Sequence, residues 1–163
     1  MMTNRKIIEI AAILTLSAAD ALAEQKRIIV SIPDRKLLLL DGSRVVKIYD
    51  IAVGTPATPS PAGEFRIINR VPNPTWFGRG KVVGPGAQNP LGSRWLGLSA
   101  KGYGIHGTNA PASIGKAASH GCIRMRKHDI EELFDLVDVG VPVELHQDRP
   151  AIVLMILAVA VAD

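Results

Sequence analysis

The sequence predicts a mainly β fold, with β-sandwich-like mixed sheets, one amphipathic helix at about residues 127–139 and a long lid loop. Three observations support this fold class. The 15 Gly and 11 Pro all lie between residues 24 and 150, where they make up about a fifth of the chain, against an average of about 12%. Short apolar runs alternate with turn sequences. Only one stretch places its apolar residues at helical spacing.

Three apolar runs separated by turn residues begin the predicted β domain. They are Ile28–Ile32, Lys36–Leu40 and Val45–Val53. Asp41-Gly42 lies between the second run and the third, and both residue types tolerate the positive φ of a tight turn. We therefore expect the three runs to be strands and the last two to form a hairpin.

The next run, Glu64–Val71, alternates between a mostly apolar face and a mostly polar face. One face carries Phe65, Ile67, Asn69 and Val71. Alternation of this kind is typical of a strand in a sheet that has one solvated face. We expect the apolar face of this strand to contribute to the core of the domain.

Two irregular segments flank this strand. Gly54–Gly63 is a loop rich in Pro, Thr, Ser and Gly, and Pro72–Ser93 is a 22-residue segment that contains Trp76 and Phe77. Irregular segments of this length are usually functional or disordered, and the two aromatic residues argue against disorder. We interpret residues 72–93 as a lid or cleft wall, with a packed surface loop as the alternative.

The predicted helix lies within Arg126–Gly140. Its apolar positions are Ile130, Leu133, Phe134 and Val137. Asp129, with Glu132 three residues later, resembles a capping box at the start of a helix, and Gly140 is typical of a helix end. A last strand is expected at Val141–His146.

Apolar residues make up 47% of the chain, but many of them lie at its two ends. Arg5 and Lys6 precede the apolar stretch Ile7–Leu16, and Ala21-Leu22-Ala23 follows with small residues. This order predicts a secretory signal peptide over residues 1–23, cleaved after Ala23, with an uncleaved anchor helix as the alternative. An exported protein of this kind belongs in the periplasm or cell envelope.

The C-terminal tail, residues 150–163, contains the wholly apolar run Ala151–Ala162. As a helix this run would reach about 18 Å, which is shorter than the ~30 Å hydrocarbon core of a membrane. The tail is therefore expected to pack on the domain, to be poorly ordered, or to lie on a membrane surface. Residues 24–149 remain as one domain, and membrane contact is expected only through the signal peptide or the tail.

The formal net charge of +4 is mild, and the basic residues are scattered. The chain lacks the dense basic patches that indicate nucleic-acid binding, so no nucleic-acid partner is expected. Cys122 is the single cysteine. In an oxidising compartment cysteines usually pair as disulfides, so a lone cysteine among polar and flexible neighbours is a candidate for thiol chemistry.

The residues around Cys122 favour nucleophilic catalysis. A thiol reacts as a thiolate and needs a base or a cation beside it, and His106 is the candidate base because the histidine pKa lies near neutral pH. Gly121 leaves the neighbouring backbone N–H groups unobstructed, which suits an oxyanion hole. Zinc binding by His106, His120, Cys122 and His128 is the alternative, but their spacing matches no recognised zinc pattern. We expect no metal and no cofactor, and structural or solvated roles for His128 and His146.

The catalytic candidates lie in two motifs. These are His106-Gly107-Thr108 and Ser119-His120-Gly121-Cys122-Ile123-Arg124. Together with the earlier Pro-Ala-Gly-Glu-Phe segment and the run Asn89-Pro90-Leu91-Gly92, they resemble the signature of the L,D-transpeptidases, the YkuD-like catalytic domain of bacterial cell-wall enzymes. The resemblance covers about residues 27–147 and implies a YkuD-like fold.

The resemblance implies a role for each motif residue. Cys122 would be the nucleophile and His106 the general base, oriented by the backbone carbonyl of Gly107 where a triad enzyme uses a carboxylate. The backbone N–H groups of His120, Gly121 and Cys122 would form the oxyanion hole.

The expected substrate-binding residues extend from the same motif to the lid. Ser119 and His120 would shape the acyl-donor site, and Arg124 would meet a substrate carboxylate. We also place Trp76, from the predicted lid, among the substrate-binding residues.

The implied reaction is peptidoglycan transpeptidation. The Cys122 thiolate attacks the amide between an L-configured centre and a terminal D-alanine of a tetrapeptide stem, D-alanine leaves, and the acyl group passes to an amine. The acceptor is a second stem, for cell-wall cross-linking, or an envelope lipoprotein, and the resemblance further implies a role in cell shape and sensitivity to carbapenems. An L,D-carboxypeptidase or cysteine peptidase, and a non-catalytic wall-binding module, are the alternatives.

Overall fold

The computed structural model describes residues 25–160, and strands are the main secondary structure of this part of the chain. Their bounds are β1 Lys26–Ser31, β2 Lys36–Asp41, β3 Arg44–Gly54, β4 Gly63–Pro72, β5 Trp76–Gly78, β6 Lys81–Val83, β7 Arg94–Leu98, β8 Gly104–His106, β9 Ala117–Ser119, β10 Ile123–Met125 and β11 Pro142–His146. The helices are the 3-10 turn Pro111–Ser113, α2 Lys127–Leu136 and α3 Ala151–Ala160. The predicted mainly β fold is confirmed. The predicted signal peptide lies outside the described residues.

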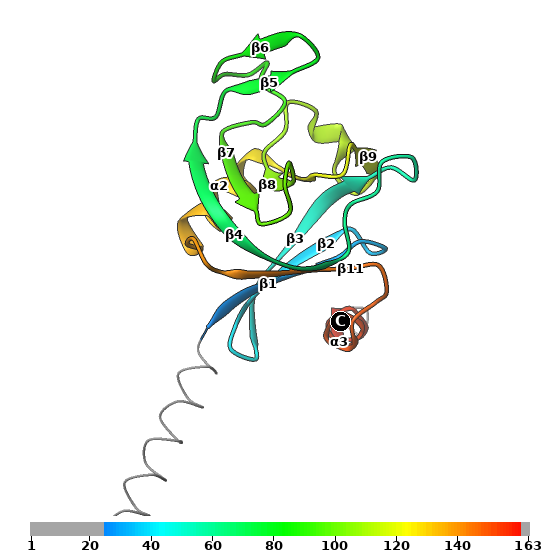
Figure 1. Cartoon of the computed structure of the whole chain (residues 1–163). Coiled ribbons are helices and arrows are strands. Elements are labelled where there is room, and N and C mark those ends of the chain that lie inside the picture. Colours follow the sequence, from blue (N-terminus) through cyan, green and yellow to red (C-terminus); the bar gives the residue numbers. More distant parts are fainter. Residues whose placement is uncertain (1–24, 161–163) are drawn as a thin grey trace, which may run out of the picture.

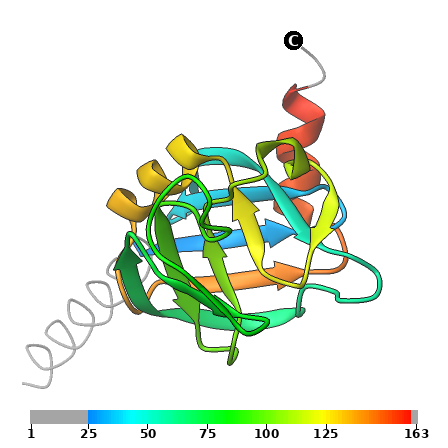
Figure 2. The same ribbon diagram turned by 90° about the horizontal axis from the view of Figure 1, so that it is seen from above.

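Two sheets share the long strands β3 and β4, which gives the fold its sandwich-like form (Figures 1 and 2). The strands pair in the order β10-β8-β7-β4-β11-β1-β2-β3-β9, and β3 also pairs with β10. The first part of β3 pairs with β2, and its end pairs with β10 and β9. Similarly, β4 pairs first with β11 and then with β7. The main hydrophobic core lies between the sheets and includes Ile28, Leu39, Ile51, Ile105 and Ile123.

The predicted hairpin at Asp41-Gly42 is present. β2 and β3 are antiparallel, with Asp41 opposite Arg44, and Gly42 has a φ of 59°. Positive φ at such a turn matches the right-handed twist of the strands that it joins. The first three strands therefore follow the local sequence pattern to within one or two residues.

The alternation predicted for Glu64–Val71 holds only for its first half. Ile67 is 1% exposed and Ile68, on the expected solvated face, is 54% exposed, but a register shift between Ile67 and Asn69 leaves Val71 39% exposed. A bulge adds one residue to a strand and so moves the following side chains to the opposite face. Beyond the bulge the guanidinium of Arg70 packs over the Phe134 ring, 4.3 Å from its centroid.

The predicted helix starts at Lys127 as expected but is three residues too long, and the capping box predicted at Asp129 is wrong. α2 ends at Leu136, and Gly140, with a φ of 97°, lies in the turn that leads to β11. Arg126 is the N-cap and forms no side-chain cap, while Asp129 lies within the first turn. The Asp129 carboxylate instead meets Nε2 of His128 at 2.7 Å. A carboxylate in the first turn still interacts favourably with the helix dipole.

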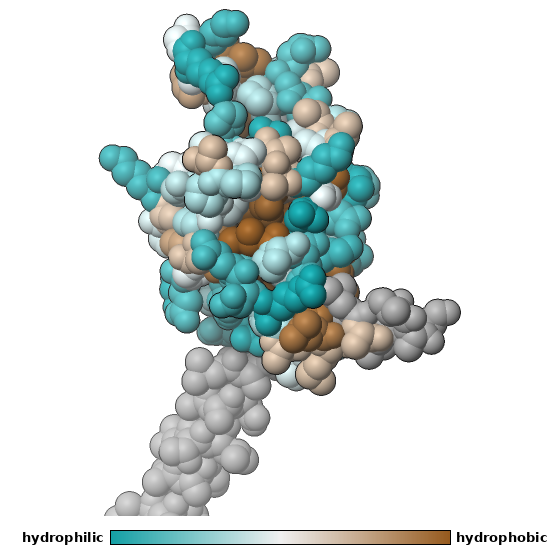
Figure 3. Space-filling view, turned by 90° about the vertical axis from the view of Figure 1, so that its right-hand side faces the viewer, coloured by the Kyte–Doolittle hydropathy of each residue, from teal (hydrophilic) through white to brown (hydrophobic). Residues whose placement is uncertain are grey.

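The apolar tail forms α3, which packs on the outer face of β1 and β2. Val153 is 1% exposed and contacts Ile29, Leu38 and Leu40 in a second, smaller core. The outer side of the helix remains apolar and exposed, with Met155 at 70% (Figure 3). In residues 25–160 no helix has both the length and the hydrophobicity of a membrane span.

The segment predicted as a lid contains the β5–β6 hairpin, which stands above the two sheets at the end of the molecule opposite α3 (Figure 1). Asn89, which is fully buried, holds the base of this hairpin. Its side-chain N–H groups donate to the carbonyl oxygens of Pro74, Val83 and Gly84, at 2.7, 3.2 and 3.1 Å. The hairpin is therefore anchored at its base by one buried amide.

Candidate active site

Cys122 lies in the tight turn between β9 and β10. The turn requires Gly121, whose φ is 111° and whose missing Cβ would lie 2.6 Å from a ring carbon of Tyr103. The Ser119 hydroxyl closes the turn, because it donates to the Cys122 carbonyl at 2.5 Å and accepts the Gly121 N–H at 3.0 Å. These contacts fix the backbone that carries the thiol.

The loop between β3 and β4 supports this turn from below. The Ser60 hydroxyl, 2% exposed, donates to the Gly121 carbonyl at 2.8 Å and accepts the Gly54 N–H at 2.9 Å. The Thr58 hydroxyl donates to the Ser119 carbonyl at 3.1 Å. Residues about sixty positions upstream in the chain therefore hold the cysteine turn in place.

His106 ends β8, directly beside β10, because the parallel register places it opposite Arg124. Its imidazole is 5% exposed and stacks on the Trp95 ring, with centroids 5.6 Å apart and an interplanar angle of 21°. Nδ1 lies 2.5 Å from the Gly107 carbonyl oxygen. A carbonyl only accepts, so Nδ1 carries the proton and Nε2 keeps its lone pair when the ring is neutral.

Burial keeps both candidate catalytic groups uncharged. Burial is the main cause that lowers the pKa of His106 from 6.5 to about 4. The hydrogen bond with Gly107 raises this pKa, and the positive charge of Arg124 lowers it. Burial raises the pKa of the Cys122 thiol above its ordinary value, although a Gly104 backbone hydrogen bond and Arg124 act the other way. At neutral pH the site therefore holds a neutral imidazole and a neutral thiol.

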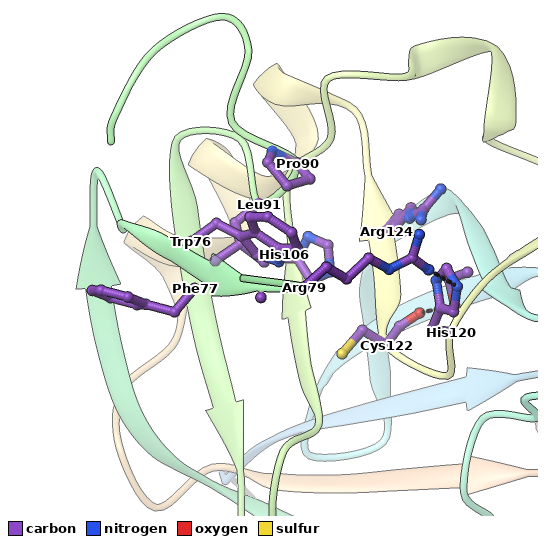
Figure 4. Close-up of a pocket in the computed structure, with 11 residues that line it drawn as sticks. Trp76, Phe77, Arg79, Pro90, Leu91, His106, His120, Cys122 and Arg124 are labelled. Carbon is purple, nitrogen blue, oxygen red and sulfur yellow. Dashed lines mark hydrogen bonds between the residues drawn. The ribbon is translucent and has the colours of Figure 1, made fainter. Parts of the chain in front are cut away.

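The thiol and the imidazole line one pocket of about 480 Å³ beneath the β5–β6 hairpin (Figure 4). The lining residues are Trp76, Phe77, Gly78, Arg79, Pro90, Leu91, His106, Ser119, His120, Cys122 and Arg124. The Cys122 Sγ lies 3.7 Å from the Gly102 carbonyl oxygen. Among the hydrogen bonds of the described residues none joins Sγ to His106.

The structure brings six of the predicted site side chains to this pocket: Cys122, His106, Ser119, His120, Arg124 and Trp76. Ser119 and the predicted oxyanion-hole residue Gly121 differ in detail from the expectation. Ser119 is 2% exposed, and its hydroxyl is occupied by the backbone of the cysteine turn. The Gly121 N–H donates to that same hydroxyl, so it does not point freely into the pocket.

The two remaining histidines lie elsewhere. His128 contacts Asp129 on α2, and Nε2 of His146 lies 3.0 Å from a carboxylate oxygen of Glu144 on β11. Over residues 25–160, no three His, Cys, Asp or Glu side chains are grouped so that they would hold a metal ion. His128, proposed in the zinc alternative, is thus separated from His106 and Cys122.

Three residues important to the site were missed by the sequence analysis. Ser60 and Asn89 act through buried hydrogen bonds, and Arg79 reaches His120 across the pocket at 2.8 Å. The Asn89-Pro90-Leu91-Gly92 run was noticed only as part of the resemblance, although a buried Asn often marks such a loop anchor. No local pattern distinguished Ser60 or Arg79 from ordinary loop residues.

Comparison with known proteins gives consistent matches. The family model described as the L,D-transpeptidase catalytic domain matches residues 25–145. A Bacillus licheniformis protein that carries the name L,D-transpeptidase YkuD is 48% identical over 119 residues, which cover 73% of this chain and 64% of that protein. This chain therefore spans slightly less than two thirds of the length of that relative.

Solved structures agree with the sequence matches. The catalytic domain of an Enterococcus faecium L,D-transpeptidase superposes with a TM-score of 0.62 and 29% identity, over 76% of this chain and 98% of that domain. The Ldtfm–avibactam carbamoyl enzyme superposes with a TM-score of 0.66 and 29% identity, over 77% of this chain and 50% of that one.

Proposed function

This chain belongs to the family of the L,D-transpeptidase catalytic domain, and we propose that it is a peptidoglycan L,D-transpeptidase that acts through a thioester on Cys122. One observation carries the proposal. The Cys122 thiol and the His106 imidazole line the same pocket, and the Gly107 carbonyl leaves Nε2 of His106 as the acceptor for the thiol proton.

The first half of the reaction forms the thioester. As Sγ attacks the carbonyl carbon that precedes D-alanine, Nε2 of His106 takes the thiol proton and the carbonyl oxygen becomes an oxyanion. When the intermediate collapses, the C–N bond breaks and the imidazolium returns its proton to the departing D-alanine amine. A neutral thiol and a neutral imidazole suit this general-base route, because proton transfer and attack occur together.

The second half transfers the acyl group. An amine attacks the thioester carbonyl, His106 takes a proton from it, and the C–S bond breaks as the thiol regains a proton. One amide replaces another, so the exchange consumes no ATP. This property fits an enzyme that works outside the cytoplasm, in the periplasm or cell envelope.

Backbone N–H groups of the cysteine turn are proposed to bind the oxyanion. The N–H groups of His120 and Cys122 are the principal candidates. The Gly121 N–H donates to Ser119, so it contributes only if that hydrogen bond opens. Ser119 is therefore proposed to be a positioning residue for the turn rather than a group that touches the substrate.

The remaining pocket residues are proposed to hold the acyl donor. The aromatic ring of Trp76 lines the pocket on the side of the β5–β6 hairpin, and Arg124 on β10 contributes a positive charge to the pocket. The partners are peptidoglycan stem peptides, with a second stem or an envelope lipoprotein as the acceptor. A structural neighbour forms a carbamoyl enzyme with avibactam, and we propose that Cys122 of this chain is acylated by carbapenems.

An L,D-carboxypeptidase is the second candidate, because Cys122 is half-buried and lines the pocket, so a thioester on it would also be accessible to water. Incubation of the full chain with purified tetrapeptide stems, followed by mass analysis of the products, separates the two. Cross-linked dimers with release of D-alanine support the transpeptidase. Tripeptides alone indicate hydrolysis, and unchanged stems would indicate a wall-binding module.

A further inference from the structure

The tip of the β5–β6 hairpin carries an arginine that points back into the pocket. Arg79 and Gly80 form the two-residue turn between Gly78 and Lys81, with φ values of 50° and 71°. Turns with two positive φ values normally use Asn, Asp or Gly. A long cationic side chain in this conformation suggests a function for the side chain beyond turn formation.

The Arg79 side chain spans the mouth of the pocket (Figure 4). Its Nη2 atom lies 2.8 Å from Nε2 of His120, two residues before the candidate nucleophile. A guanidinium has five N–H donors in a planar fork and pairs best with a carboxylate, which accepts two hydrogen bonds in parallel. An imidazole nitrogen accepts only one hydrogen bond, so the contact with His120 uses only one of the five N–H donors of the Arg79 guanidinium.

The surrounding charges also favour an anionic ligand. Arg124 lines the same pocket, and none of the residues described as lining it is acidic. Over residues 25–160, Arg27, Arg70, Arg126 and Arg149 form ion pairs with carboxylates, and Arg79 and Arg124 are among the arginines that do not. Two guanidiniums without carboxylate partners therefore face one cavity.

We propose that Arg79 is a specificity-determining residue that recognises a carboxylate of the acyl-donor peptide and exchanges its hydrogen bond with His120 for that carboxylate. The inference rests on the proposed function for the identity of the donor. Because Arg79 is at the hairpin tip and Asn89 anchors only the base, binding of a carboxylate would also hold the hairpin over the donor.

Binding to the full chain carrying Cys122→Ala tests the inference without turnover. Calorimetric titration uses a D-alanine-terminated tetrapeptide stem with free carboxylates, and the same peptide with every carboxylate converted to a carboxamide. Arg79→Gln is expected to raise the Kd of the free-acid peptide about tenfold, as for loss of one solvent-accessible hydrogen bond to a charged group. Arg79→Gln should change the Kd of the amidated peptide by no more than about twofold, because this peptide offers no carboxylate to Arg79 or to Gln at that position.

Lys81→Gln is the matched control, because it removes a positive charge from the same hairpin at an exposed position outside the pocket lining. It should leave both Kd values within about twofold. Arg79→Lys should weaken free-acid binding by an intermediate factor, since it keeps the charge but loses the planar fork. Equal weakening of both peptides by Arg79→Gln, or equal effects of Arg79→Gln and Lys81→Gln, would overturn the inference.

Failure of the inference and failure of the proposed function give different results. If the unsubstituted chain releases D-alanine while Arg79→Gln leaves the free-acid Kd unchanged, only the role of Arg79 is wrong. If the Cys122→Ala chain binds neither peptide and the unsubstituted chain releases no D-alanine, both are wrong.

Discussion

Nδ1 of His106 lies 2.5 Å from the carbonyl oxygen of Gly107, the next residue in the chain. A backbone carbonyl orients the imidazole much as a carboxylate does in a catalytic triad, but it carries no full negative charge to stabilise an imidazolium. Burial therefore dominates, and the pKa of His106 falls to about 4. The contact thus selects both the tautomer and the charge state of the proposed base.

The lowered pKa of His106 makes stability depend on pH. Below pH 6.5 the unfolded chain takes up a proton on this residue, while the folded chain does so only near pH 4. The contribution of His106 to the free energy of unfolding should therefore be constant above about pH 6.5 and fall as the pH drops toward 4. Urea unfolding at several pH values between 7 and 5 should show this decrease in the free energy of unfolding. His106→Gln should remove the part of the decrease that is due to protonation of His106. His120→Gln serves as the exposed control, and loss of the same part of the decrease in that variant would contradict the assignment.

Gly121→Ala is expected to destabilise the chain more than Gly115→Ala. Both glycines have positive φ, 111° and 84°, but a Cβ at Gly121 would lie 2.6 Å from Tyr103, whereas nothing lies within 4 Å at Gly115. The backbone strain costs roughly 1–2 kcal/mol at either position, and overpacking adds roughly 1–3 kcal/mol at Gly121. Thermal unfolding measures the difference. Equal losses would mean that the turn has room for a side chain.

Ser60→Ala should weaken the fold around the cysteine turn, although Ser60 is far from Cys122 in sequence. The change leaves the Gly54 N–H and the Gly121 carbonyl without their hydroxyl partner, at a cost of about 2–3 kcal/mol in the free energy of unfolding. Ser113→Ala removes one exposed hydroxyl contact and should cost less than about 1 kcal/mol. A Ser60→Ala chain as stable as the Ser113→Ala chain would contradict the bridging role.

Val153→Ala tests whether α3 is part of the folded domain. Val153 is 1% exposed and fills the second core against β1 and β2, so truncation should lower the free energy of unfolding by about 1–2 kcal/mol. Met155→Ala, at a position 70% exposed on the same helix, should change it by less than about 0.5 kcal/mol. Equal, small effects would show that the helix does not pack on the sheet in solution.

Features that depend on local sequence were predicted well. The Asp41-Gly42 hairpin follows from two residues that tolerate positive φ, and the neighbourhood of His106 and Cys122 follows from short motifs with a recognisable spacing. The bulge at Ile68 could not be predicted, because it arises from the pairing of β4 with β7. The capping box predicted at Asp129 was wrong, because the helix begins at Lys127 and the Asp129 carboxylate contacts its neighbour His128.

The long-range hydrogen bonds of Ser60 and Arg79 at the site could not be predicted from the sequence. Ser60 meets Gly121 and Arg79 meets His120 across separations of 61 and 41 residues. Contacts of this kind depend on the folded topology and leave no periodic or composition signal. The catalytic candidates and Gly107, whose carbonyl orients His106, could thus be named from the chain alone, whereas Ser60 and Arg79 could not.

Mass analysis of the intact protein after brief exposure to a D-alanine-terminated tetrapeptide tests the central claim most directly. Peptide mapping should place an adduct on Cys122 with the mass of the donor less D-alanine, and Cys122→Ala should give neither an adduct nor released D-alanine. An unlabelled Cys122 with D-alanine still released, or release that persists in Cys122→Ala, would contradict the thioester mechanism.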